Sequence, residues 1–100
     1  MPRIKSVDPL GEKRLLVTFV NGIQKIYSCQ EIIPLERFRL LASDALFKSV
    51  VVDVGGYGVS WDDEMDLSEY ELRTNGVEIA PSKTRLIGSS MNEQGAVVAK

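Results

Sequence analysis

The residues best able to do chemistry are acidic and lie close together in the second half of the chain. Carboxylate oxygens suit Mg²⁺ or Ca²⁺, but their spacing here does not match a calcium-binding EF-hand loop, which needs acids at alternating positions, a central glycine and a glutamate at position twelve. Three interpretations stay open: a solvated loop leading into a helix whose dipole favours acids, a docking surface for a basic protein, and a metal site. The carboxylates between residues 62 and 71 are Asp62, Asp63, Glu64, Asp66, Glu69 and Glu71.

We favour the solvated loop over the metal site, and therefore expect no metal or other cofactor. The docking surface ranks between these two. The candidate partner-binding residues are Asp62, Asp63, Glu64 and Asp66. No catalytic residue is assigned.

Histidine is absent from the chain, and cysteine occurs once, at Cys29. Without histidine the chain cannot carry a Ser-His-Asp or Cys-His triad or a histidine-bearing zinc site. A lone cysteine cannot form an internal disulfide, which indicates a reducing compartment. A reactive thiol needs a lowered pKa, and only Lys25 and Arg14 could supply it. We therefore expect Cys29 to be an ordinary small residue.

The composition predicts one small domain. The chain has 100 residues, of which 44% are hydrophobic, and this suffices for a single core. No apolar run approaches the roughly 20 residues of a membrane-spanning helix, and the N-terminus lacks the apolar segment of a signal peptide. We expect a cytoplasmic protein with one domain over residues 1–80 and a loosely attached tail over 81–100.

The first structural signal is a hairpin around Asn21-Gly22, which separates apolar, β-branched runs over residues 13–20 and 23–28. A two-residue turn would place Val17 opposite Ile26. The predicted core face then holds Leu15, Val17, Phe19 and Ile26, while Thr18 and Lys25 fall on the other face. Residues 3–8 are expected to form a preceding strand, with a turn over 9–11.

A second hairpin is predicted around Gly55-Gly56, between residues 49–54 and 57–61. Its register pairs Val52 with Val59 and leaves one apolar and one mostly polar face. Tyr57 and Trp61 could form a binding platform, but this register favours a place in the core for both. The predicted apolar face comprises Val50, Val52, Val54, Tyr57, Val59 and Trp61.

Helical sequence lies between and after the hairpins. Pro34 suits a first helical turn, and apolar residues recur at helical spacing at Leu35, Phe38, Leu41 (or Ala42) and Ala45. Ser43 or Asp44 could cap a second short helix running through Phe47. A polar loop is expected over 62–67. The capping-box pattern Ser68-Glu69-Tyr70-Glu71 predicts a helix that ends near Gly76, and residues 77–80 are expected to form a short strand.

The order of these parts resembles the bacterial domain-of-unknown-function family numbered 2442. The residues that carry the resemblance are Arg3 to Val7, Leu15 to Phe19, Asn21-Gly22, Leu46-Phe47, Val50, Val52-Asp53, Gly56, Val59, Trp61 and Asp66-Leu67. The resemblance covers residues 3–75 and implies a small two-layer α+β fold with no assigned activity or cofactor. Some members of the family are followed by a DNA-binding helix-turn-helix, and others are encoded beside a small protein in a toxin–antitoxin-like arrangement. This chain departs from the family pattern at Trp61, where Trp61-Asp62-Asp63-Glu64 stands in place of the usual Trp-Pro-Asn-Gly-like stretch.

The sequence thus predicts an α+β fold, a small antiparallel sheet built from two hairpins with one or two helices on one face. The leading function is a non-enzymatic protein-interaction module, antitoxin-like or otherwise partner-binding. One alternative is a regulatory domain related to the members with a helix-turn-helix, although the segment after residue 80 is short for that motif. The other is a carboxylate-dependent metal enzyme using Asp62, Asp63 and Asp66. The expected partner is another protein, with no membrane, no direct nucleic-acid binding, and a homodimer left open.

Overall fold

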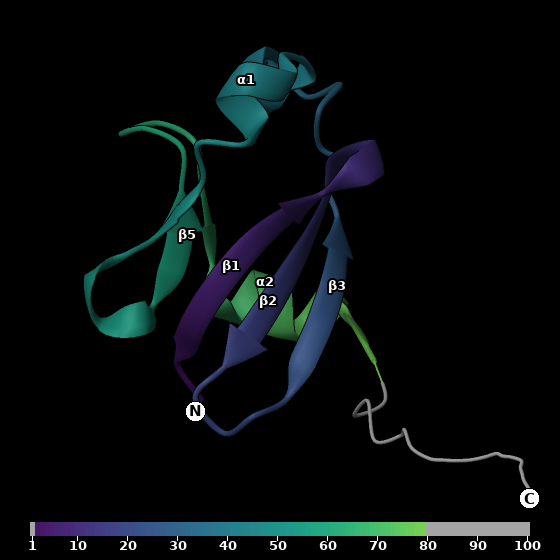
Figure 1. The fold of residues 1–100 in the computed structure, drawn as a ribbon. Helices are drawn as coiled ribbons and strands as arrows, with labels where there is room; N and C mark the ends of the chain where they lie inside the picture. The colour runs from purple at the N-terminus through teal and green to yellow at the C-terminus, as the bar shows by residue number, and fades with distance from the viewer. Residues whose placement is uncertain (1, 80–100) are drawn as a thin grey trace, which may run out of the picture.

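The structure, a computed structural model, describes residues 2–79 and is built around two antiparallel sheets (Figure 1). The α+β class is confirmed, and the two predicted hairpins belong to different sheets. The larger sheet has the order β1 (Ile4–Leu10), β2 (Arg14–Phe19), β3 (Gln24–Ser28) and β7 (Val77–Glu78). The smaller sheet has the order β4 (Val51–Val52), β5 (Gly58–Ser60) and β6 (Asp66–Ser68).

Short helices connect the strands and cover one side of the larger sheet. In Figure 1, α2 crosses behind β1, β2 and β3, and α1 lies beyond one end of the strands. Among residues 2–79, no helix lies on the face of the larger sheet that is turned toward the viewer. The helices are η1 (Gly11–Lys13), η2 (Glu36–Ala42), α1 (Asp44–Phe47), η3 (Val54–Gly56) and α2 (Glu69–Asn75), where η denotes a 3-10 helix.

The first hairpin forms, but its predicted register is wrong by one residue. The loop comprises Val20, Asn21 and Gly22, because the N–H of Phe19 donates to the carbonyl of Ile23 and the N–H of Gly22 donates to that of Phe19. Of these three residues only Gly22 has a positive φ, of 90°. A two-residue type I′ turn needs positive φ at both central residues, whereas a three-residue loop needs it at one glycine. The third loop residue shifts the pairing of the two strands.

This shift exchanges two side chains between the faces of β3. Leu15 now pairs with Tyr27, and Leu16 pairs with Ile26. Leu15, Val17 and Phe19 are buried as expected, but Tyr27 joins them in the core in place of Ile26. Ile26 lies on the uncovered face, half-buried. A slip of one residue reverses every side chain of a strand.

The second hairpin keeps its predicted register, with Val52 opposite Val59. Its loop comprises four residues, from Val54 to Tyr57, closed by the hydrogen bond from the Asp53 N–H to the Gly58 carbonyl. Lengthening the loop from two to four residues adds one residue on each side of the turn, so the same residues of the two strands remain paired. The two residues at its ends leave the apolar face, however: Val54 is 99% and Tyr57 63% exposed. The placement of Tyr57 in the core is therefore wrong.

The remaining elements follow the sequence with local differences. The capping residues are confirmed: the Oγ of Ser43 accepts from the N–H of Leu46 at the start of α1, and that of Ser68 accepts from the N–H of Glu71 at the start of α2. The helix expected from Pro34 begins at Glu36 and is a 3-10 helix. It buries Phe38 and Leu41, whose spacing of three matches its period. Leu35, just before it, and Ala45, in α1, are exposed.

Two predicted spans also differ in detail from the structure. The polar loop ends earlier than expected, because β6 starts at Asp66 and pairs with β5. The first turn is η1, since β1 continues through Pro9 to Leu10. The tail over 81–100 lies outside the described residues. Within residues 2–79, no helix is long and apolar enough to span a membrane.

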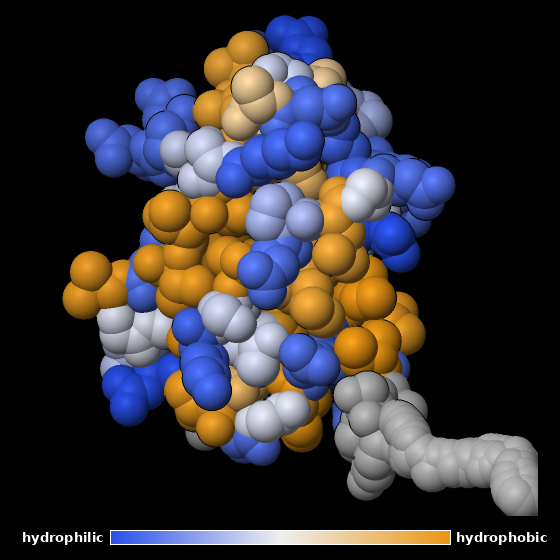
Figure 2. All heavy atoms as spheres, in the orientation of Figure 1, coloured by the Kyte–Doolittle hydropathy of each residue, from blue (hydrophilic) through white to orange (hydrophobic). Residues whose placement is uncertain are grey.

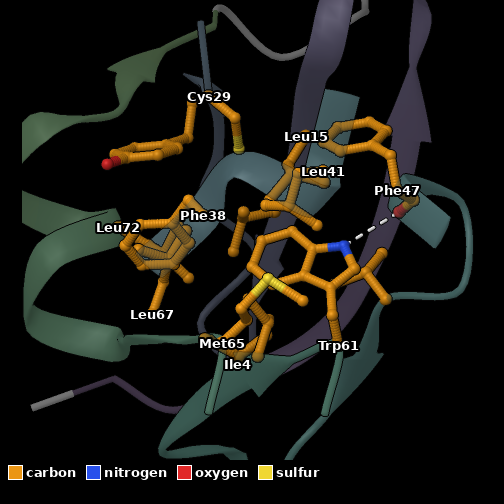
Figure 3. Packing of buried hydrophobic residues seen from close by; sticks show 14 of the residues in the cluster. Ile4, Leu15, Cys29, Phe38, Leu41, Phe47, Trp61, Met65, Leu67 and Leu72 are labelled. Carbon is orange, nitrogen blue, oxygen red and sulfur yellow. Dashed lines mark hydrogen bonds between the residues drawn. The ribbon is translucent and has the colours of Figure 1, made fainter. Parts of the chain in front are cut away.

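One core joins the two sheets to the helices, and Trp61 lies inside it as predicted. Its indole N–H donates to the carbonyl of Phe47 at 2.9 Å. The two rings also stack, with centroids 6.2 Å apart. Figure 3 shows the indole beside Met65, with this bond drawn as a dashed line. The core comprises Ile4, Leu15, Val17, Phe19, Tyr27, Cys29, Phe38, Leu41, Phe47, Val50, Val59, Trp61, Met65, Leu67 and Leu72.

Candidate functional site

The acidic loop, residues Asp62 to Asp66, is ordered by its own hydrogen bonds. One carboxylate oxygen of Asp62 accepts the backbone N–H groups of Glu64 and Met65, both at 2.8 Å. Arg37 of η2 donates to the carbonyl of Glu64 at 2.9 Å and to the carboxylate of Asp66 at 2.7 Å. Asp62, Asp63, Glu64 and Asp66 are all exposed. The loop therefore presents negative charge to solvent, as the solvated-loop interpretation expects.

The other two carboxylates of the cluster turn away from this loop. Glu69 is buried and its carboxylate accepts from the Nε of Arg73 at 2.6 Å. Glu71 accepts the phenolic hydrogen of Tyr27 at 2.8 Å. Across residues 2–79, no three His, Cys, Asp or Glu side chains converge in a way that could hold a metal ion. The six carboxylates, although close in sequence, thus do not converge on one site.

Cys29 lies fully buried in the core, next to the end of β3. Burial raises the pKa of its thiol to about 12, so the thiol is almost entirely protonated at neutral pH. The ammonium group of Lys25 is bound elsewhere, because it donates to the carbonyl of Arg73 in the last turn of α2, at 2.6 Å. The thiol therefore has the environment of a small apolar residue.

The larger sheet carries an apolar row on the face that none of the described helices covers. Leu16 of β2 pairs with Ile26 of β3, which pairs in turn with Val77 of β7. Paired residues of antiparallel strands point to the same face, so these three side chains lie side by side across three strands. On the next strand, β1, the residue paired with Leu16 is the charged Asp8, so the row of apolar side chains ends there. We call Leu16, Ile26 and Val77 the apolar row.

Polar side chains flank the apolar row on the same face. Gln24 donates to the hydroxyl of Thr18 at 3.0 Å in the neighbouring cross-strand row. Figure 2, which views this face, shows hydrophobic atoms gathered across its middle between polar ones. Leu16 and Ile26 are half-buried, and Val77 is exposed. The sequence did not indicate this surface, because a two-residue turn at Asn21-Gly22 would place Ile26 in the core. The three-residue loop places it on this face instead.

A groove of about 630 Å³ adjoins the end of this row. It lies where β3 runs on past the last residue pair that it forms with β7. Burial, and then the hydrogen bond to Glu71, raise the pKa of the Tyr27 phenol well above its usual value. The groove is lined by Ile26, Tyr27, Ser28, Glu31, Ile32, Glu71, Asn75, Val77 and Ile79.

Comparison with known proteins identifies a family. No curated protein and no solved structure matches this chain. Residues 4–78, which span both sheets and every described helix, match the family described as "Protein of unknown function (DUF2442)". The resemblance noted from the sequence is confirmed, and the chain belongs to the DUF2442 family.

Proposed function

We propose that this chain binds another protein and has no catalytic role of its own. The observation that carries the proposal is the apolar row on the uncovered face of the larger sheet. An antiparallel sheet that is solvated on one side normally shows polar side chains there. Leu16, Ile26 and Val77 instead form a continuous apolar strip across three strands. Contiguous exposed apolar surface with a polar rim is typical of protein-binding sites.

The state of the reactive side chains supports a non-catalytic role. Cys29 is buried with a raised pKa, Glu69 is paired with Arg73, and Glu71 is hydrogen-bonded to Tyr27. A catalytic group needs a reacting atom within hydrogen-bond reach. In the described part of the chain these three groups serve the structure: Cys29 packs in the core, Glu69 pairs with Arg73 within α2, and Glu71 links α2 to β3.

The acidic loop is a second candidate surface. Exposed charges at the rim of an interface mainly change the association rate, because they attract a partner over long range. Asp62, Asp63 and Glu64 are exposed, and Asp66 pairs with Arg37, which is itself exposed. We propose that the loop steers a positively charged partner toward the chain, while the apolar row supplies the packed contact.

The experiment compares two leucine variants in a capture from extracts of the source cell. Leu16→Thr removes apolar area from the row with a residue that suits a strand. Leu40→Thr makes the same change on η2, at an exposed position away from the row. We expect wild type and Leu40→Thr to retain the same protein and Leu16→Thr to lose it. Equal capture by all three chains would overturn the proposed surface.

Sedimentation of the purified chain tests whether a second copy of the same chain, rather than a different protein, covers this face. We expect a monomer, since the row is proposed to bind a different protein. A wild-type dimer that dissociates with Leu16→Thr but not with Leu40→Thr would assign the face to a second copy of the chain and contradict the proposal.

A further inference from the structure

We propose that the groove beside the apolar row receives an extended, positively charged segment of the partner protein. This inference rests on the proposed function and adds the chemistry of what is recognised. Three features of the groove carry it: an open strand end, carboxylates without a cation, and apolar residues that continue the row.

The strand end follows from the pairing of β3 with β7. Within residues 2–79, β7 pairs with Lys25 and Ile26 only, so Ser28 extends beyond it. The N–H of Ile79 donates to the carbonyl of Gln24, which shows that the even-numbered residues of β3 turn their backbone groups to this side. Ser28 is the next such residue after Ile26. Its backbone groups therefore face the groove, where an extended segment can continue the sheet.

The charge of the groove is negative and uncompensated. Glu31 and Glu71 line it, and no lysine or arginine is among its lining residues. The ion pairs of the described residues use other carboxylates, those of Asp44, Asp66 and Glu69. The hydrogen-bond partner of Glu71 is the neutral phenol of Tyr27. A lysine or arginine of the incoming segment would compensate this charge.

Apolar side chains set the remaining specificity. Ile32 and Val77 line the groove, and Val77 is also the end of the apolar row. Side chains alternate along an extended segment. A segment that places cations toward Glu31 and Glu71 can therefore place β-branched residues between them, against Ile32 and Val77. The predicted ligand alternates basic and β-branched residues.

The probe is the peptide acetyl-Thr-Val-Lys-Val-Arg-Val-Thr-amide, titrated into the isotopically labelled full chain and followed by amide chemical shifts. A second peptide with glutamate in place of its lysine and arginine is the charge control. The double variant Glu31→Gln/Glu71→Gln removes both groove charges, and glutamine still accepts the bond from Tyr27. Glu12→Gln/Glu36→Gln removes two exposed charges that lie outside both the groove and the acidic loop, and is the matched control.

We expect the basic peptide to shift the amides of Ser28, Ile32 and Asn75, and the acidic peptide to leave them unchanged. Loss of these two charges should lower the affinity about fivefold in Glu31→Gln/Glu71→Gln, with no comparable loss in Glu12→Gln/Glu36→Gln. Higher salt should weaken binding, since it screens exposed charges. Equal binding of both peptides, or shifts confined to residues 62–66, would overturn the inference. If Leu16→Thr abolishes capture of the partner while the basic peptide leaves the groove unperturbed, this inference fails and the proposed function stands.

Discussion

Tyr27 donates its phenolic hydrogen to Glu71 over 2.8 Å, although the two residues lie 44 positions apart in the sequence. The bond joins β3 to α2 and forms part of the wall of the groove. Glu71 would complete a capping box if its side chain reached back to Ser68. Glu71 contacts Tyr27 instead, so this residue of the first turn of α2 links the helix to the sheet.

Removing this bond should lower stability and change its alkaline dependence. Tyr27→Phe should reduce the free energy of unfolding by about 1–2 kcal/mol at neutral pH, and Glu71→Gln by less because it keeps an acceptor. The pKa of Tyr27 is raised in the folded state, so its contribution is complete below the unfolded pKa of about 10 and is lost as the pH rises above it. Urea unfolding at pH 7 and pH 10.5 measures this. Wild type should lose more stability than Tyr27→Phe between the two pH values; equal losses would contradict the role of the phenol.

The Trp61 indole should be the most costly single side chain to remove from the core. Trp61→Ala should lower the free energy of unfolding by about 3–5 kcal/mol, through lost burial and the cavity left behind. Trp61→Phe keeps most of the apolar volume but loses the bond to the Phe47 carbonyl, and should cost about 1–3 kcal/mol. Chemical denaturation gives both values. A folded alanine variant that loses less than about 1 kcal/mol would place the indole outside the core.

Gly22 and Gly56 both have a positive φ, but only at Gly56 would an added side chain collide with a neighbour. Alanine at the two positions therefore compares the cost of backbone strain alone with the cost of strain plus a steric clash. A Cβ on Gly22 would meet nothing within 4 Å, whereas one on Gly56 would lie 2.6 Å from the carbonyl oxygen of Ile4. Gly22→Ala should cost about 1 kcal/mol, from the left-handed backbone alone. Gly56→Ala should cost about 2 kcal/mol more, because the tip of the second hairpin must move away from β1. Equal unfolding midpoints for the two variants would show that η3 is not packed against β1.

The charges of the acidic loop should change the rate of association with the partner and hardly change the free energy of unfolding. The fourfold variant Asp62→Asn, Asp63→Asn, Glu64→Gln and Asp66→Asn keeps the side-chain acceptor that orders the loop. Exposed substitutions usually change stability by no more than about 0.5 kcal/mol each. Association of the captured partner should be slower than for wild type and less sensitive to salt. Stopped-flow mixing over a range of ionic strength measures this, and identical salt slopes would exclude the loop as the steering surface.

Local signals predicted most of the elements, because caps and turns depend on neighbouring residues. Ser43 and Ser68 cap the helices that their positions indicated, and Gly55-Gly56 marked a hairpin tip. The register of the first hairpin could not be settled in this way. Asn21-Gly22 is compatible with loops of two or three residues, and the choice depends on whether Tyr27 or Ile26 packs in the core against α2, a contact between distant parts of the chain.

The candidate site was accessible to sequence reasoning only in part. The exposed carboxylates of the acidic loop could be recognised from their polar surroundings. Strand β6 could not, since Leu67 is its single apolar residue and its pairing partner is β5. The apolar row and the groove depend on which face of β3 Ile26 occupies and on where β7 ends, and both are set by tertiary packing.

Two matched valines distinguish a partner that binds at the apolar row from one that binds elsewhere. Val77 in the row and Val51 on β4 each begin a two-residue strand, and they are 69% and 59% exposed. Titration calorimetry with the captured partner should show an affinity about tenfold weaker for Val77→Thr than for wild type, since a buried valine exchanged for threonine loses on the order of 1.4 kcal/mol. Val51→Thr should bind like wild type. Equal affinities for the two variants would contradict the account.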